Sequence, residues 1–278
     1  MRSPPPDRPL HGPRNSVIVA GAVLCIWLIL AVFGSSTESG PAAALLLSGL
    51  WLTLLISLIS ILGGALIAAG VVVVRMLLVP GLWQLAAGYM VFFRGTPLIA
   101  QLYLVYYGAG EIHAGLEHYR LWWLVSDPLH CVLLTFILNT GAYQAHVVYG
   151  ALRALPKEQT DAALALGLRY SPTLLKILLP QAMLIAMRPL TNEATKMLKA
   201  SAIASVVTVF DLLGVTKILY NETFDFSYYY LAACVYLVVI GGVRLSLERL
   251  ETYFMRHLAS EPGTFGPPSD PSIELGRV

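Results

Sequence analysis

Six apolar runs, separated by short polar segments, constrain this chain more than any other feature of its sequence. A membrane-spanning helix needs about 20 mostly apolar residues. The runs cover residues 17–33, 42–74, 82–108, 129–150, 181 to about 214, and 228–247. The chain is 57% apolar and 12% charged, with a mean hydropathy of +0.70, which excludes an ordinary soluble domain. We therefore predict an all-α, polytopic membrane protein with six transmembrane helices.

The ends of the chain differ from these runs in composition. Residues 1–16 are rich in proline and arginine, and residues 256–278 are rich in glycine, proline and serine. Such segments bury too little apolar surface to fold, so we expect two disordered tails around a transmembrane domain at 17–255. No small-residue cleavage site follows the first run, which favours a retained helix over a secretion signal.

Lysine and arginine are distributed unevenly between the segments that connect the runs. If the N-terminus is cytoplasmic and the spans alternate, the external segments hold only Arg120 and Lys217 of these residue types. The remaining connections and both tails then carry the positive charge that cytoplasmic segments favour. We expect both termini to be cytoplasmic, together with the connection at 151–179.

That connection, residues 151–179, is a charged insert whose pattern predicts two short helices. Pro156 suits the first turn of the first helix, and Gly167 suits the position after its end. Ser171, followed by Pro172, predicts the start of the second helix. Structured inserts of this length are uncommon between spans, so we expect a surface for a partner.

The first helix of the insert carries the candidate contact residues. Asp161 is polar, whereas Ala162, Ala163 and Leu166 make a small apolar side that a partner's groove could accept closely. The alternative is an amphipathic hairpin that merely lies on the membrane.

The third run is interrupted at residues 94–97, Arg-Gly-Thr-Pro. Gly95 and Pro97 break a helix, and Thr96 suits the N-cap of a new half-helix at 97–107. Such a break leaves unpaired N–H groups inside the membrane, where they and Arg94 could bind a carboxylate. Gln101 of the half-helix belongs to the same candidate path. The alternative is a structural kink in which Arg94 pairs with a neighbour or reaches the membrane surface.

The fifth run carries polar residues on one helical face. At about 100° per residue, the spacing aligns Arg188, Asn192, Thr195, Lys196 and Lys199. Glu193 lies beside this stripe, within one turn of Lys196. Charges inside a membrane are costly and face a cavity or one another. The stripe is therefore a polar wall along a substrate path or an ion-pair network that fixes helix packing.

Several classes of site have no support in the sequence. There is no glycine-rich phosphate loop, no zinc-protease motif and no nucleophile elbow, so we assign no catalytic residue, no metal ligand and no cofactor. Basic residues lie at the membrane faces, which gives nucleic-acid binding no support. Cys25, Cys131 and Cys234 lie inside apolar runs without metal-ligand spacing.

Four segments resemble permease subunits of ABC importers over roughly residues 45–255. The spacing Asp161-Ala162-Ala163, Gly167 and Leu179-Pro180 resembles the cytoplasmic "EAA" loop of these permeases, with Asp161 where the family usually has Glu. Residues 92–108 and 138–157 resemble the polar amino-acid permeases, although His146 replaces a usual Glu. Residues 192–199, beginning Asn-Glu, are similar to the histidine and basic amino-acid branch.

This resemblance implies a five-helix core of the type I importer permeases, here with an extra N-terminal helix. It implies an inner-membrane permease for a polar, and by its branch a basic, amino acid. The implied partners are an ATPase subunit that uses ATP and docks on 156–180, a second permease and an extracytoplasmic binding protein. An ion-driven secondary transporter is the alternative, although it needs no docking insert, and a membrane-embedded enzyme would need a constellation that is absent. The amino acid carried, the identity of the second permease, and the roles of the first helix and of His146 stay open.

Overall fold

The structure is a computed structural model, and it describes residues 39–77 and 81–259. The predicted span at 17–33 and the tail at 1–16 lie outside the described residues. So do residues 260–278 of the predicted C-terminal tail, whereas its first residues belong to the last helix, which continues to Ala259.

Within the described ranges, the regular structure is entirely helical, as predicted. The α-helices are α2 (Ser39–Leu77), α3 (Leu82–Gly95), α4 (Leu98–Glu111), α5 (His113–His118), α6 (Pro128–Arg153), α7 (Lys157–Ala165), α8 (Tyr170–Thr173), α9 (Leu179–Ala200), α10 (Leu212–Thr223) and α11 (Ser227–Ala259). Shorter turns of other helix types are η1 (Trp122–Leu124), the π-helical η2 (Leu174–Leu178) and η3 (Ser201–Val207).

Four helical stretches of the described chain are long and apolar enough to cross a membrane, at 41–76, 128–153, 170–207 and 227–253. They correspond to the second, fourth, fifth and sixth predicted runs. The third run is interrupted where predicted, which divides it into two 14-residue helices, α3 and α4, each too short to be counted among these four. The predicted fifth run also ends early, because η3 terminates at Val207 and α10 starts separately at Leu212.

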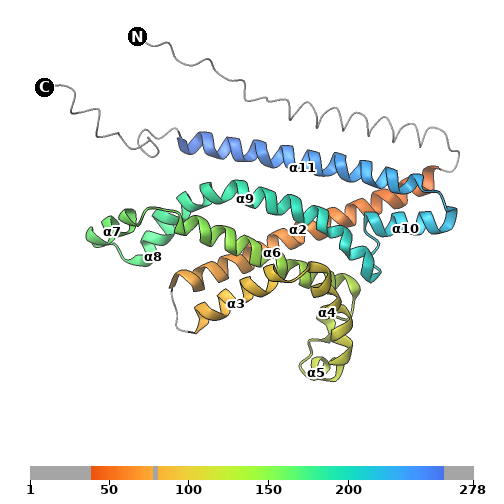
Figure 1. Cartoon of the computed structure of the whole chain (residues 1–278), viewed down its shortest axis with the longest axis horizontal. Helices are drawn as coiled ribbons and strands as arrows, with labels where there is room; N and C mark the ends of the chain where they lie inside the picture. The colour runs from red at the N-terminus through yellow and green to blue at the C-terminus, as the bar shows by residue number, and fades with distance from the viewer. Residues whose placement is uncertain (1–38, 78–80, 260–278) are drawn as a thin grey trace, which may run out of the picture.

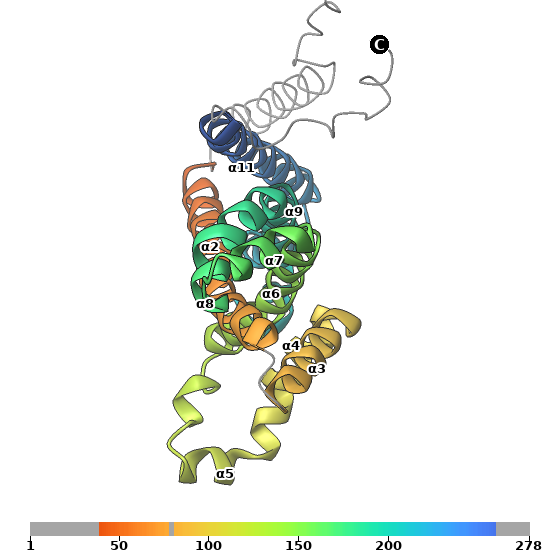
Figure 2. The ribbon, with the colours of Figure 1, turned by 90° about the vertical axis from the view of Figure 1, so that its left-hand side faces the viewer.

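The long helices α2, α6, α9 and α11 run side by side, and α6 lies between α9 and α3 (Figure 1). Helix α6 packs against α2, α3, α4 and α9, whereas α11 packs against α9 and α10. Helices α7 and α8 lie at one end of this bundle and α10 at the other. Helices α4 and α5 project away from the bundle as an arm (Figure 2).

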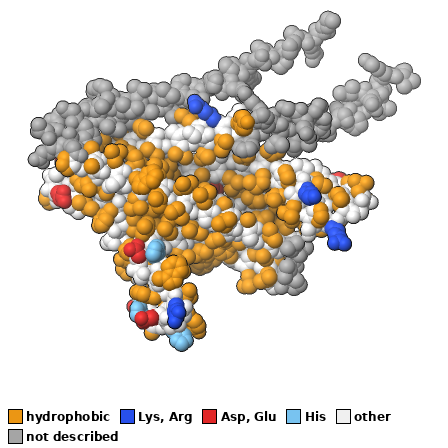
Figure 3. Space-filling model, turned by 180° about the vertical axis from the view of Figure 1, so that it is seen from behind, with side chains coloured by type: hydrophobic (Ala, Val, Ile, Leu, Met, Phe, Trp, Pro, Cys, Tyr) orange, Lys and Arg blue, Asp and Glu red, His pale blue; other side chains and the backbone are white. Residues whose placement is uncertain are grey.

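Two glycines allow α2 and α6 to cross closely. A Cβ atom on Gly64 would lie 3.0 Å from the backbone nitrogen of Gly141, and one on Gly141 would lie 3.1 Å from the Cβ of Ile67 in α2. Close backbone approach through small residues is how helices pack where no hydrophobic drive joins them. The described part of the face seen in Figure 3 is largely apolar, as expected for helices that face lipid.

Candidate functional site

The break in the third run is made by Thr96 and Pro97. The Thr96 N–H and hydroxyl both donate to the carbonyl oxygen of Phe92, at 3.1 and 2.8 Å, so Thr96 ends α3. The prediction that Thr96 caps the following helix is wrong, because its hydroxyl donates back into α3. Pro97 occupies the N-cap of α4 without a side-chain cap, and the half-helix runs to Glu111 rather than 107.

The side chains of Gln101 and Asn139 stabilise this break through hydrogen bonds. The buried Gln101 amide nitrogen donates to the Phe93 carbonyl at 2.9 Å and to the Thr96 hydroxyl at 2.7 Å. Asn139 of α6 donates to the Gln101 carbonyl oxygen and to the Phe93 carbonyl oxygen, each at 3.0 Å. These contacts tie α3, α4 and α6 together. Sequence reasoning assigned Asn139 no role, although a buried amide in an apolar run is a signal for one.

Arg94 lies in the last turn of α3 and faces Tyr143 of α6. Its guanidinium carbon is 5.6 Å from the centroid of the Tyr143 ring, which is cation–π distance. Its Nε is buried and has no hydrogen-bond partner among the described residues. Among the ion pairs of the described chain, none involves Arg94. The neighbour of Arg94 is therefore an aromatic ring, and whether Arg94 also contacts a carboxylate ligand stays a prediction.

A cavity of about 220 Å³ opens between α4, α6 and α9, next to the break. Its walls are Leu98, Asn139, Thr140, Tyr143, Glu193, Lys196, Met197 and Ala200. Leu98 is the first residue of α4, so the uncapped N–H groups of that half-helix start at this cavity. The positive end of a helix dipole favours an anionic group there.

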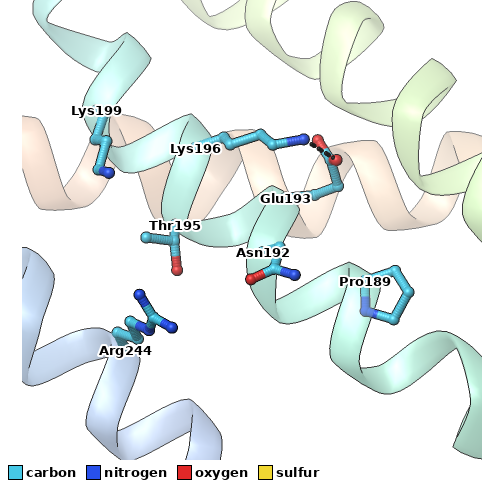
Figure 4. A pocket seen from close by; sticks show the side chains of 7 residues that line it. All are labelled: Pro189, Asn192, Glu193, Thr195, Lys196, Lys199 and Arg244. Carbon is cyan, nitrogen blue, oxygen red and sulfur yellow. Dashed lines mark hydrogen bonds and ion pairs between the residues drawn. The ribbon is translucent and has the colours of Figure 1, made fainter. Parts of the chain in front are cut away.

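A second cavity, of about 420 Å³, lies between α9 and α11 (Figure 4). It is lined by Pro189, Asn192, Glu193, Thr195, Lys196, Lys199 and Arg244. Asn192 and Thr195 project from α9 toward Arg244 of α11. The predicted polar stripe therefore does face a cavity, and Arg244 is a lining residue that sequence reasoning missed because it lies on another run.

Glu193 and Lys196 line both cavities and form an ion pair. The Lys196 Nζ lies 2.7 Å from the Glu193 Oε1 (Figure 4). The Glu193 side chain is 14% exposed, whereas that of Lys196 is 66% exposed. An i,i+3 pair with such an exposed lysine contributes about 0.5 kcal/mol or less. The carboxylate is thus largely buried, whereas most of the lysine side chain is exposed.

Arg188 belongs to an ion pair between helices, which was the second interpretation of the polar stripe. Its Nε lies 2.9 Å from the Oε1 of the buried Glu251, so it joins α9 to α11. Arg244 lies 2.8 Å from Glu248 one turn along α11. Part of the stripe is therefore a helix-packing ion pair and part lines a cavity, so neither alternative covers the whole stripe.

A third cavity, of about 310 Å³, continues along the same α6–α9 interface toward α7. Its lining comprises His146, Val147, Gly150, Ala151, Ala154, Ile185, Ala186 and Pro189. Pro189 also lines the second cavity. His146 is the polar side chain in this otherwise apolar wall of described residues, and it belongs to no group of metal ligands in the described part of the chain.

The insert contains the predicted first helix and its predicted stop. Gly167 has φ of +80°, a left-handed conformation that favours glycine. Its N–H donates to the Leu164 carbonyl at 2.9 Å, and the Leu168 N–H donates to the Ala163 carbonyl at 3.1 Å. This pair of bonds is a Schellman motif. Pro156 is the N-cap of α7 rather than a first-turn residue.

The second predicted helix of the insert is not separate. It starts at Tyr170 after Arg169, without a side-chain cap, and continues through η2 into α9. The prediction that Ser171 caps it is wrong, because the backbone is already helical at Tyr170. The second part of the insert, from Tyr170, and the polar wall of α9 therefore belong to one continuous helical stretch, residues 170–207.

The exposed face of α7 differs from the predicted contact surface in one residue, Ala163. Asp161 and Ala162 are exposed, and Leu166 is 82% exposed, but Ala163 is buried against the rest of the chain. Leu164 and Leu168 are exposed as well. Asp161, Ala162, Leu164, Leu166 and Leu168 thus form an exposed, largely apolar patch, which the exposed charges of Lys157 and Glu158 precede in α7.

Comparison with known proteins finds relatives that are all membrane components of transport systems. Residues 61–254 match the model of the family described as binding-protein-dependent transport system inner membrane component. The chain is 37% identical over 172 residues to the arginine ABC transporter permease protein ArtM of Escherichia coli K12, covering 62% of this chain and 77% of that protein. It is 32% identical over 198 residues to the octopine transport system permease protein OccM of Rhizobium radiobacter, covering 70% and 79%.

Solved structures share the fold. A crystal structure of an amino acid ABC transporter with histidines superposes with a TM-score of 0.66 and 27% identity, covering 77% of this chain and 94% of that one. A methionine ABC transporter in an inward-facing conformation has a TM-score of 0.64 at 20% identity, covering 78% and 99%, which shows similarity of fold alone.

Proposed function

The chain belongs to the family of binding-protein-dependent transport system inner membrane components, and from this membership we propose that it carries a basic amino acid, or a derivative of one, through the membrane. It is the permease subunit of an amino-acid ABC importer. No finding favours the ion-driven alternative. The names of its relatives, which mention arginine, octopine and nopaline, agree with a cationic cargo.

The observation that carries this proposal is the carboxylate of Glu193. Among the described residues that line the first two cavities, it is the one acidic side chain. A guanidinium or ammonium group that leaves water needs an anionic partner, or it loses several kcal/mol of hydration. Since the pair with Lys196 is weak, a cationic cargo can replace Lys196 at Glu193 while the lysine turns outward. The negative charge then stays paired throughout.

The other end of an amino acid is a carboxylate, and the start of α4 suits it. The uncapped N–H groups at Leu98 and the nearby Arg94 supply positive potential at the cavity that Glu193 also lines. An amino acid lying between α4 and α9 would meet a positive site at one end and a negative site at the other. Asn192 and Lys196 would complete the polar wall. Thr96, Pro97 and Gln101 would act on the path by shaping the break.

The drive for transport comes, in this proposal, from a separate ATPase subunit. The open patch on α7, formed by Asp161, Ala162, Leu164, Leu166 and Leu168, would fit a groove on that subunit. Exposed apolar side chains on a water-facing insert are typical of an interaction surface. Gly167 fixes where α7 stops, and the continuous stretch 170–207 would pass movement of α7 to the polar wall.

The remaining partners follow from the family and from the charge distribution. A second permease, identical or homologous, would complete the path, and an extracytoplasmic binding protein would deliver the cargo at the arm that carries α5. The lysine and arginine bias supports cytoplasmic termini and a cytoplasmic α7.

Affinity purification of the tagged full-length chain in detergent tests the class of drive. We expect an ATPase subunit to co-purify, and the complex in proteoliposomes to take up arginine in an ATP-dependent way, faster than glutamine. A folded permease that never retains an ATPase would contradict the docking proposal. Faster uptake of glutamine than of arginine would contradict the proposed cargo.

A further inference from the structure

Two arginines and two aromatic rings meet at the corner between α2 and α3, a place that none of the three cavities includes. The Arg75 guanidinium carbon lies 4.6 Å from the Tyr149 ring centroid and 5.6 Å from that of Trp83. The Arg153 guanidinium carbon lies 5.9 Å from the same Tyr149 ring. Arg75 lies in the last turn of α2 and Trp83 in the first turn of α3, whereas Tyr149 and Arg153 belong to the last turns of α6. We call these four residues the corner cluster.

The corner cluster lacks a negative charge within the described chain. None of the ion pairs of the described residues involves Arg75 or Arg153. The Arg75 Nη1 donates to the Trp83 carbonyl oxygen at 3.3 Å, and its Nε is buried without a described partner. The three residues between α2 and α3 that the structure leaves undescribed are Leu78, Val79 and Pro80, none of them acidic. Two cations around one ring repel each other unless an anion joins them.

The surroundings of the corner cluster are those of a membrane surface. Tryptophan and tyrosine are enriched where the bilayer meets water, and arginine flanks spans on the cytoplasmic side. Beside the cluster, Leu82 is 48% exposed and Leu85 is 70% exposed. A charged corner next to an exposed aliphatic strip matches a molecule with an anionic head and an apolar tail. A small free anion has no apolar part that would pack against Leu82 and Leu85.

We propose that the corner cluster binds the phosphate headgroup of an anionic phospholipid such as phosphatidylglycerol. The Arg75 and Arg153 guanidinium groups donate charge-assisted hydrogen bonds to the phosphate oxygens. Tyr149 and Trp83 hold the guanidinium planes, and the acyl chains lie along Leu82 and Leu85. The lipid thereby joins the α2–α3 corner to the end of α6, from which the insert with α7 departs. This site requires only a bilayer surface and is independent of the cargo.

Lipid retention by the purified full-length complex tests the proposal. Wild-type protein, Arg75→Gln and Arg153→Gln are exchanged into nanodiscs of phosphatidylcholine with a minor share of labelled phosphatidylglycerol, and bound label is counted by native mass spectrometry. Each variant should lose about tenfold in affinity for phosphatidylglycerol, the value of one charge-assisted hydrogen bond. Arg169→Gln removes an exposed arginine from the same end of the bundle and should retain wild-type binding.

Several outcomes would overturn the proposal. One is equal binding of phosphatidylglycerol by wild type and both variants in samples whose circular dichroism shows intact helices. A second is complete competition by inorganic phosphate, which would make the cluster a site for small anions. A third is loss of ATPase co-purification in Arg153→Gln with lipid binding unchanged, which would assign the cluster to the subunit interface. Should a glutamine variant fail to fold, Arg75→Lys keeps the charge, and its lipid affinity must still fall.

Discussion

Asp211 shows how one buried acid organises the end of the bundle opposite α7. Its side chain is fully buried just beyond the 170–207 stretch and caps α10 by accepting the Gly214 N–H at 2.9 Å. The Tyr236 hydroxyl of α11 donates to its other oxygen at 3.4 Å. Burial raises the pKa of Asp211 to about 6, although the Gly214 N–H bond opposes this shift. The hydrogen bond of the cap thus lowers the pKa of this carboxyl group, while the loss of hydration raises it.

This raised pKa predicts a pH dependence of stability. Between about pH 4 and pH 6 the folded protein keeps a proton on Asp211 that the unfolded chain has lost, so the free energy of unfolding falls as pH rises through this range. A shift from 3.8 to about 6 corresponds to about 3 kcal/mol. Thermal unfolding of detergent-solubilised wild type and Asp211→Asn, measured across this range, should show a difference in stability that changes with pH. A difference that is constant with pH would contradict the shifted pKa.

At the scale of elements, α7 is the part whose design can be tested most simply. Its stop depends on the left-handed Gly167, where any side chain costs about 1 kcal/mol. We expect Gly167→Asp to misdirect the chain after α7, and Asp161→Lys to reverse the charge of the open patch. Both should reduce transport several-fold while the ATPase continues to hydrolyse ATP. Transport and hydrolysis are measured in the same proteoliposomes.

A matched control for α7 is Glu222→Lys, an exposed charge reversal on α10 at the other end of the bundle. It should leave the coupling ratio unchanged. If both α7 variants kept the wild-type ratio of transport to ATP hydrolysis, the proposal that α7 docks on the ATPase would be contradicted.

The elements also show where sequence reasoning succeeds and where it stops. Gly167 was predictable because a helix stop is a local property of a few residues. The wrong caps at Thr96 and Ser171 have a common cause. In each case a neighbouring helical turn takes the residue: the Thr96 hydroxyl completes the end of α3, and Ser171 lies inside a helix that starts at Tyr170. The Gln101–Asn139 brace joins residues 38 apart, which periodicity within one run does not reveal.

The same limit applied to the polar stripe of α9. Helical spacing placed its members on one face, but it did not reveal which residues of α11 would face them. Glu251 of α11 pairs with Arg188, and Arg244 of α11 lines the cavity opposite the stripe. Burial of Ala163 likewise depends on how α7 folds back, and not on its own sequence.

At the scale of the whole molecule, the charge bias predicts the orientation of the bundle. The arm with α5 should be external and α7 cytoplasmic. In a background without the native cysteines at 25, 131 and 234, we expect Glu117→Cys to react with an impermeant thiol reagent added outside intact cells. Glu158→Cys should react only after the membrane is opened. The reverse pattern would overturn the orientation and the placement of the ATPase with it.

The central claim is that this permease selects a cationic cargo through Glu193, and charge-paired uptake measures it most directly. Wild type, Glu193→Gln and Lys199→Gln are assayed in proteoliposomes with the ATPase, using one cationic and one neutral amino acid of similar size. Lys199 lines the same cavity but carries the opposite charge. We expect Glu193→Gln to reduce uptake of the cationic substrate by about tenfold or more relative to the neutral one, as for the loss of a charge-assisted contact. Lys199→Gln should not reduce that ratio. An equal loss of both substrates in Glu193→Gln would contradict the account, because Glu193 would then serve helix structure through Lys196 and not selection.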